Sequence, residues 1–176
     1  MRRSGRPFTV LLILAGLALL CLLGGRLYFG RAAESRIDEE DVVDFAELSP
    51  VLKPHRFLMC PAGVCSQPAD AESPVYGMEW ERLRSYWSEV IAHQPRVKLI
   101  GGDGELKKIT YIERSSLLHL PQIVTIEFFS VGENGSSFAI ESHSRYGLLS
   151  TFDDNRALVR EWVKLLDKMT AEAPPP

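Results

Sequence analysis

The strongest constraint on the fold is an alternation of apolar and polar residues between positions 96 and 145. A period of two places successive side chains on opposite faces, so this pattern predicts strands rather than helices. The segments "RVKLI" and "ELKKITYIERS" flank the turn "GGDG", and "QIVTIEFFSV" and "SSFAIESHSR" flank "ENG". Two such hairpins predict a four-stranded antiparallel sheet with one apolar face.

Two further segments, residues 78–93 and residues 153–170, have helical periodicity. Their apolar stripes consist of Trp80, Leu83, Trp87, Val90 and Ile91 in the first segment and Leu158, Trp162, Leu165, Leu166 and Met169 in the second. Five prolines between positions 50 and 74 exclude long helices there, and "HRFLMC" is expected to be extended. We therefore predict an α+β domain over residues 42–170, with two amphipathic helices on one face of the sheet, and a disordered tail over residues 171–176.

The amino end joins a basic leader, residues 1–7, to an apolar segment without charge over residues 8–23. The export machinery reads this arrangement. A helix over residues 8–29 would approach the roughly 30 Å of a hydrocarbon core. We favour an uncleaved signal anchor, a single transmembrane helix over residues 8–29 with a charged linker over residues 30–41. The domain would then lie on the periplasmic side of a bacterial inner membrane. A removed signal peptide and a cytoplasmic fate are the alternatives.

The charge distribution argues against nucleic acid as a partner. The full chain has a net charge of −3, but residues 1–37 hold six arginines against Glu34 alone, which leaves −8 on the remainder. Nucleic-acid binding needs basic side chains gathered on one surface. We therefore expect the membrane, and an envelope protein or small ligand, as the partners of an acidic domain.

Cys60 and Cys65 lie five positions apart in "CPAGVC", around a proline and a glycine that favour a turn. In an oxidising compartment such a pair closes a small disulfide loop. Two free thiols, a redox pair or half of a metal site are the alternatives. Thioredoxin-type motifs have two intervening residues, however, and no second cysteine pair or histidine cluster completes a zinc site. We expect a structural disulfide, no metal and no cofactor.

The loop length of the second hairpin decides which of its side chains share a face. A two-residue Asn134-Gly135 turn mixes polar and apolar residues on both faces. A three-residue loop, with Gly135 in the left-handed bulge position, pairs Phe128 with Ile140 and separates the faces. The predicted core side then holds Val124, Ile126, Phe128, Phe138, Ile140, Ser142 and Ser144. The predicted outer side holds Thr125, Glu127, Glu141, His143 and Arg145, with Glu127 directly opposite Glu141.

Two interpretations fit the polar residues of this outer side, which are Glu127, Glu141, His143 and Arg145. They form either a solvent-exposed face of the sheet or a groove that recognises a polar ligand or partner. A hydrolase would need a serine hydroxyl within hydrogen-bond reach of His143. The adjacent Ser142 and Ser144 point to the opposite face of the strand, which leaves only a distant serine, such as Ser66 or Ser115, for that role.

The segments "DFAELSP", "CPAGVC", "SHSRYG" and "NRALVREW" resemble the domain of unknown function 1499 family, which comprises exported or membrane-associated bacterial and plastid proteins. The resemblance spans residues 44–169. The family signature is a Ser-x-Ser-Arg-x-Gly stretch followed by Asp-x-Gly-x-Asn-x-x-Arg. Its counterparts here are Ser142, Ser144, Arg145, Gly147 and Asn155. The chain departs from the signature between Leu149 and Asp154, where the usual Asp and Gly are replaced and one residue is inserted. The resemblance implies an exported location and names no activity.

Together these features predict a membrane-anchored cell-envelope protein whose exported domain is a binding or structural module for a partner or small ligand. We favour a non-enzymatic role. The leading alternative is an envelope hydrolase that uses His143 and a serine, and the third is a thiol redox protein that uses Cys60 and Cys65.

Overall fold

The computed structural model describes residues 6–32, 43–48, 55–103, 105, 107–116, 118–145 and 152–172. The first five residues of the predicted leader, most of the predicted linker, Gly147 and the tail from residue 173 lie outside these ranges. Along the described chain the elements are α1 (Arg6–Ala32), β1 (Phe57–Cys60), β2 (Ala71–Glu72), α2 (Trp80–Ala92), β3 (Val97–Gly102), β4 (Lys108–Arg114), β5 (Pro121–Val131), β6 (Gly135–Ser144) and α3 (Phe152–Ala171).

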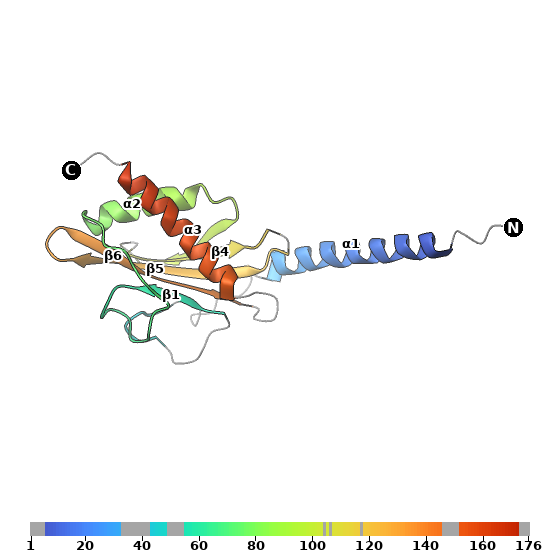
Figure 1. The fold of residues 1–176 in the computed structure, drawn as a ribbon, viewed down its shortest axis with the longest axis horizontal. Coiled ribbons are helices and arrows are strands. Elements are labelled where there is room, and N and C mark those ends of the chain that lie inside the picture. Colours follow the sequence, from blue (N-terminus) through green and yellow to red (C-terminus); the bar gives the residue numbers. More distant parts are fainter. Residues whose placement is uncertain are drawn as a thin grey trace.

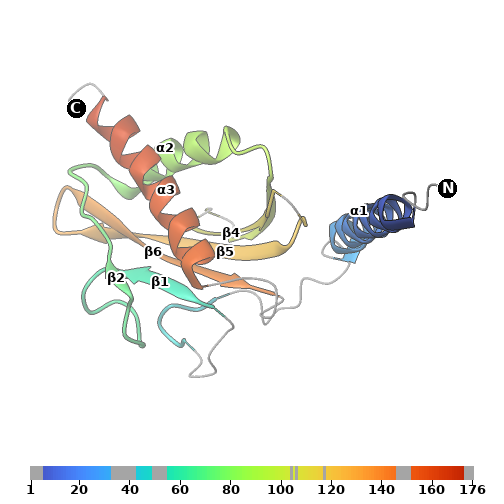
Figure 2. The same cartoon turned by 45° about the vertical axis from the view of Figure 1, so that its right-hand side comes forward.

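The strands form one mixed sheet in the order β2-β1-β6-β5-β4-β3. Helices α2 and α3 lie together over one face of this sheet (Figures 1 and 2). The predicted α+β class and the two antiparallel hairpins, β3–β4 and β5–β6, are confirmed. The predicted four-stranded extent is wrong, because β1 pairs antiparallel with β6 and β2 pairs parallel with β1.

The sequence of β1 does not alternate between apolar and polar residues, because both faces of this strand are buried. Phe57 and Met59 belong to the core under the helices, whereas Leu58 and Cys60 belong to a second apolar cluster on the other face. A strand buried on both sides reads as a continuous apolar run. "HRFLMC" was therefore recognisable as extended but not as a member of the sheet.

The main core lies between the sheet and the two helices. Trp87 of α2 meets Trp162 of α3 edge to face, with ring centroids 5.9 Å apart, and lies 6.2 Å from Phe138 of β6. Large aromatic side chains in such contact contribute much of a core's apolar burial. The predicted helical stripes are confirmed at their centres, but Leu165 is exposed, because the buried stripe of α3 runs through Trp162 and Leu166 instead.

The register of β5 and β6 differs from the predicted one by two residues. Phe128 lies opposite Phe138, and the three-residue loop starts at Gly132, whose φ of 64° lies in the left-handed region. Gly135 closes the strand pair, where a Cβ atom would lie 2.6 Å from the Val131 carbonyl oxygen. Glycine is thus needed at position 135 because the Val131 carbonyl approaches closely, and at position 132 because the backbone is in the left-handed region. A shift of two preserves the faces, so the predicted apolar side is confirmed.

Helix α1 contains a 21-residue apolar stretch, Phe8–Tyr28, that is long and apolar enough to cross a membrane. None of its central window is buried against the rest of the chain, and the helix projects away from the sheet and its helices (Figure 1). A signal sequence has the same properties, so the helix indicates secretion or anchoring. The predicted disulfide between Cys60 and Cys65 is confirmed, and a disulfide is typical of an extracytoplasmic compartment.

Candidate ligand pocket

Three of the five signature positions meet at the start of α3. The Ser142 hydroxyl donates to Asn155 Oδ1 at 2.8 Å. The Asn155 amide nitrogen donates to Ser144 Oγ at 2.9 Å and to the His55 carbonyl oxygen at 2.6 Å. We call these groups the Asn155 cluster. The three side chains are buried, and the cluster joins β6, the first turn of α3 and the segment before β1.

The Asn155 cluster has a structural role that follows from its bonding. Buried polar groups are stabilising only when they are hydrogen-bonded, and here both ends of the Asn155 amide are used. Arg145 lies half-buried just past the end of β6, where its backbone N–H donates to the Pro121 carbonyl oxygen at 3.3 Å. The cluster therefore fixes where α3 crosses the sheet.

The opposite side of β6 holds a buried contact between a carboxylate and an imidazole rather than a solvent-exposed face. Glu141 and His143 are 1% and 4% exposed, and His143 Nδ1 lies 3.2 Å from Glu141 Oε1. The solvent-exposed interpretation is therefore wrong for these two residues. Glu127 does not oppose Glu141 as predicted. It lies opposite Ala139 and forms an ion pair with Lys108 at 3.3 Å, so the expected carboxylate repulsion is absent.

The geometry separates His143 from its neighbouring serines. Ser142 and Ser144 bond Asn155 on the helix side of β6, whereas the imidazole lies on the other side with Glu141. Ser66 Oγ accepts the Leu48 N–H at 2.9 Å, and Ser115 Oγ accepts the Leu120 N–H at 3.0 Å. A carboxylate–imidazole pair is two-thirds of a hydrolytic triad, but the two adjacent serines do not complete it.

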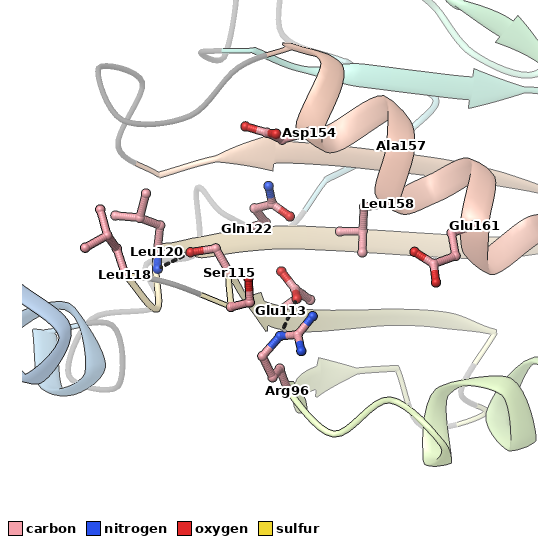
Figure 3. Close-up of a pocket in the computed structure, with 11 residues that line it drawn as sticks. Arg96, Glu113, Ser115, Leu118, Leu120, Gln122, Asp154, Ala157, Leu158 and Glu161 are labelled. Carbon is pink, nitrogen blue, oxygen red and sulfur yellow. Dashed lines mark hydrogen bonds and ion pairs between the residues drawn. The ribbon is translucent and has the colours of Figure 1, made fainter. Parts of the chain in front are cut away.

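A pocket of about 510 Å³ lies beside the Asn155 cluster, between α3 and the ends of β4 and β5 (Figure 3). We call it the α3 pocket. Its volume falls in the roughly 300–1,000 Å³ range of small-molecule sites. It is lined by Arg96, Glu113, Ser115, Ser116, Leu118, Leu120, Gln122, Asp154, Ala157, Leu158 and Glu161.

The floor of the α3 pocket is polar. Glu113 of β4 lies directly opposite Gln122 of β5, and Gln122 lies opposite Ser144 of β6. Glu113 and Gln122 are only 6% and 7% exposed. One row of polar side chains thus runs from the pocket to the Asn155 cluster, in register positions that apolar residues occupy elsewhere on this face.

Glu113 is held by Arg96. Arg96 Nε donates to Glu113 Oε1 at 3.3 Å (Figure 3). It also donates to the Arg114 carbonyl oxygen at 2.8 Å. Burial raises the pKa of the Glu113 carboxyl above its ordinary value of 4.5; Arg96 opposes this rise, and Glu161 adds to it. A buried carboxyl with a perturbed pKa in a pocket is a candidate functional group.

Gln122 is the second distinctive group. In the part of the chain that the structure describes, its side-chain amide makes no hydrogen bond, although the side chain is nine-tenths buried and lines the pocket. Gln122 is not among the side chains whose polar atoms are buried without a partner, so its amide reaches the open space of the pocket. The Gln122 amide is therefore placed to bond something inside the pocket.

The wall formed by α3 is both acidic and apolar. Ala157 and Leu158 lie three and four residues after Asp154, and Glu161 lies four and three residues after them, so all four share one face of the helix (Figure 3). Within the described residues, no group of three or more His, Cys, Asp or Glu side chains is placed to hold a metal ion.

Our sequence predictions did not identify this pocket. The available signal was the presence of Glu113 and Gln122 at inward-facing positions of apolar strands, "ITYIERS" and "PQIVTIEFF". Polar residues at core positions are exceptions that call for an explanation. No protein-family model and no curated protein matches this chain, so the site is interpreted from its geometry alone.

Proposed function

We propose that this protein is a membrane-tethered binding module of the bacterial cell envelope, whose exported domain holds a small polar ligand in the α3 pocket. The observation that carries the proposal is the Gln122 side chain, which is only 7% exposed, lines the pocket and makes no hydrogen bond to the described residues.

The location rests on three features that agree. Helix α1 has the length and composition of a membrane span, the Cys60–Cys65 disulfide suits an oxidising compartment, and the charge beyond residue 37 is acidic. An anchor with the domain on the periplasmic side accounts for all three. The resemblance to the domain of unknown function 1499 family supports the same location.

A binding role fits the described geometry better than the hydrolase alternative. Ser142 and Ser144 are committed to Asn155, and His143 is buried on the opposite side of β6 from them. The α3 pocket and the His143 side chain are therefore on different faces of the sheet. A reaction in the pocket would have to proceed without His143.

The test is a comparison of the small molecules that copurify with the full chain from its native membrane. Ala157 is an exposed residue of α3 that lines the pocket, so Ala157→Trp fills the pocket without disturbing the core. Ala171→Trp, at the exposed end of the same helix, is the matched control. Mass spectrometry should detect a compound with the wild type and the control that is lost with Ala157→Trp. Identical sets of compounds in all three samples would overturn the proposed function.

A further inference from the structure

The side chains of the α3 pocket select a ligand by charge. Three carboxylates, Glu113, Asp154 and Glu161, line it against the guanidinium of Arg96. A second guanidinium, that of Arg26 of α1, lies at its edge, where it donates to the carbonyl oxygen of the lining residue Ser116 at 3.2 Å. The Arg96 Nε is already used by Glu113 and by the Arg114 carbonyl oxygen. A concave site lined with an excess of one charge concentrates ions of the opposite charge and repels those of the same charge. The pocket therefore favours a cation over an anion.

The floor of the pocket adds a specific hydrogen-bonding group. The Gln122 amide offers a carbonyl oxygen to a donor from inside the pocket, and it lies directly opposite Glu113 in the strand register. A protonated amine carries three donors and no acceptor. One ammonium group can therefore bond the Gln122 oxygen and a neighbouring carboxylate at the same time.

The remaining walls are apolar. Leu118 and Leu120 come from the segment between β4 and β5, and Leu158 comes from α3 (Figure 3). Apolar walls around a few placed polar groups are the usual composition of a small-molecule site. They match a short aliphatic chain next to the charged group.

We infer that the α3 pocket binds a small organic cation, a protonated primary amine on a short aliphatic chain, with Gln122 and Glu161 as its specificity-determining residues. This inference rests on the proposed function and names the ligand class of the same site. It goes further because it predicts which chemically matched compounds the pocket rejects.

Gln122 provides a test that separates a ligand-binding role from a structural one. Gln122→Met keeps the length of the side chain and removes its polar end. If the amide serves the ligand, the variant loses affinity and its melting temperature stays the same, because the amide makes no hydrogen bond to the described residues. An amide that supported the fold would lower the melting temperature when replaced.

The experiment uses the full chain in non-ionic detergent and a four-carbon series titrated by calorimetry: 1,4-diaminobutane, 1,4-butanediol and succinate. We expect saturable binding of the diamine only. Gln122→Met should weaken it by about tenfold or more, because a hydrogen bond to a charged donor is lost. Glu161→Gln should weaken it about two- to fivefold, as for a partly exposed charge. Glu89→Gln, an exposed change on α2, should leave it unchanged.

Three results would overturn the inference: no binding of the diamine, equal binding of the diol, or an unaltered affinity in Gln122→Met. These results are distinguishable from failure of the proposed function. If Ala157→Trp still removes a copurifying compound while the diamine does not bind, the pocket is a site for another ligand class and only the present inference falls.

Discussion

Replacing Asn155 by alanine should destabilise the domain more than any surface change. The substitution removes three hydrogen bonds, to Ser142, to Ser144 and to the His55 carbonyl oxygen. Each neutral bond contributes about 1 kcal/mol net, and buried groups that lose a partner cost about 1–3 kcal/mol each. We therefore expect the free energy of unfolding to fall by about 3–5 kcal/mol.

The assay is urea unfolding of the full chain in non-ionic detergent, followed by the fluorescence of the buried Trp87 and Trp162. Asn134→Ala is the matched control, because Asn134 is exposed in the β5–β6 loop, and it should change stability by about 0.5 kcal/mol or less. Ser142→Ala should add little to Asn155→Ala, since both remove the same bond. A loss from Asn155→Ala as small as that of the control would refute a structural role for the Asn155 cluster.

Three further predictions concern the other buried groups. His143→Ala removes a buried polar contact to Glu141 and should lower the free energy of unfolding by about 1–3 kcal/mol, measured in the same urea assay. Cys65→Ser opens the disulfide to Cys60 and should lower stability by about 2 kcal/mol; intact-mass analysis with and without reductant checks the bond in the wild type, and an unchanged mass would contradict it. Because burial raises the pKa of Glu113 in the folded state, the folded state binds its proton more tightly, so stability falls as the pH rises from 4.5 through the raised pKa. Glu113→Gln should flatten this fall in thermal melts between pH 4 and about 7, and an unchanged slope would contradict the assignment.

The sequence predicts the local elements well, because periodicity reports which face of an element is buried. The segments at α2, α3 and β3 to β6 were all identified in this way. Strand β1 was not assigned to the sheet, since both of its faces are buried and it lacks alternation. The register of β5 and β6 was two residues off because the left-handed position was assigned to Gly135, whereas Gly132 adopts it and Gly135 allows the close approach to Val131.

The sites were less predictable, because they depend on contacts between distant segments. The pattern placed Glu141 and His143 on the outer face correctly, but local spacing does not tell whether another segment buries that face. The α3 pocket unites Arg96, Glu113 and Gln122 with α3, more than thirty residues along the chain. Ser142, Ser144 and Asn155 were singled out as signature positions, and the structure adds the bonds that join them.

The measurement that tests the account most directly is the side of the membrane on which the domain lies. Alkaline phosphatase, which folds only outside the cytoplasm, and a green fluorescent protein, which fluoresces only inside, would each be fused after Pro176. An exported domain predicts phosphatase activity and no fluorescence. Fluorescence without phosphatase activity would contradict the exported location, and with it the envelope role proposed for the α3 pocket.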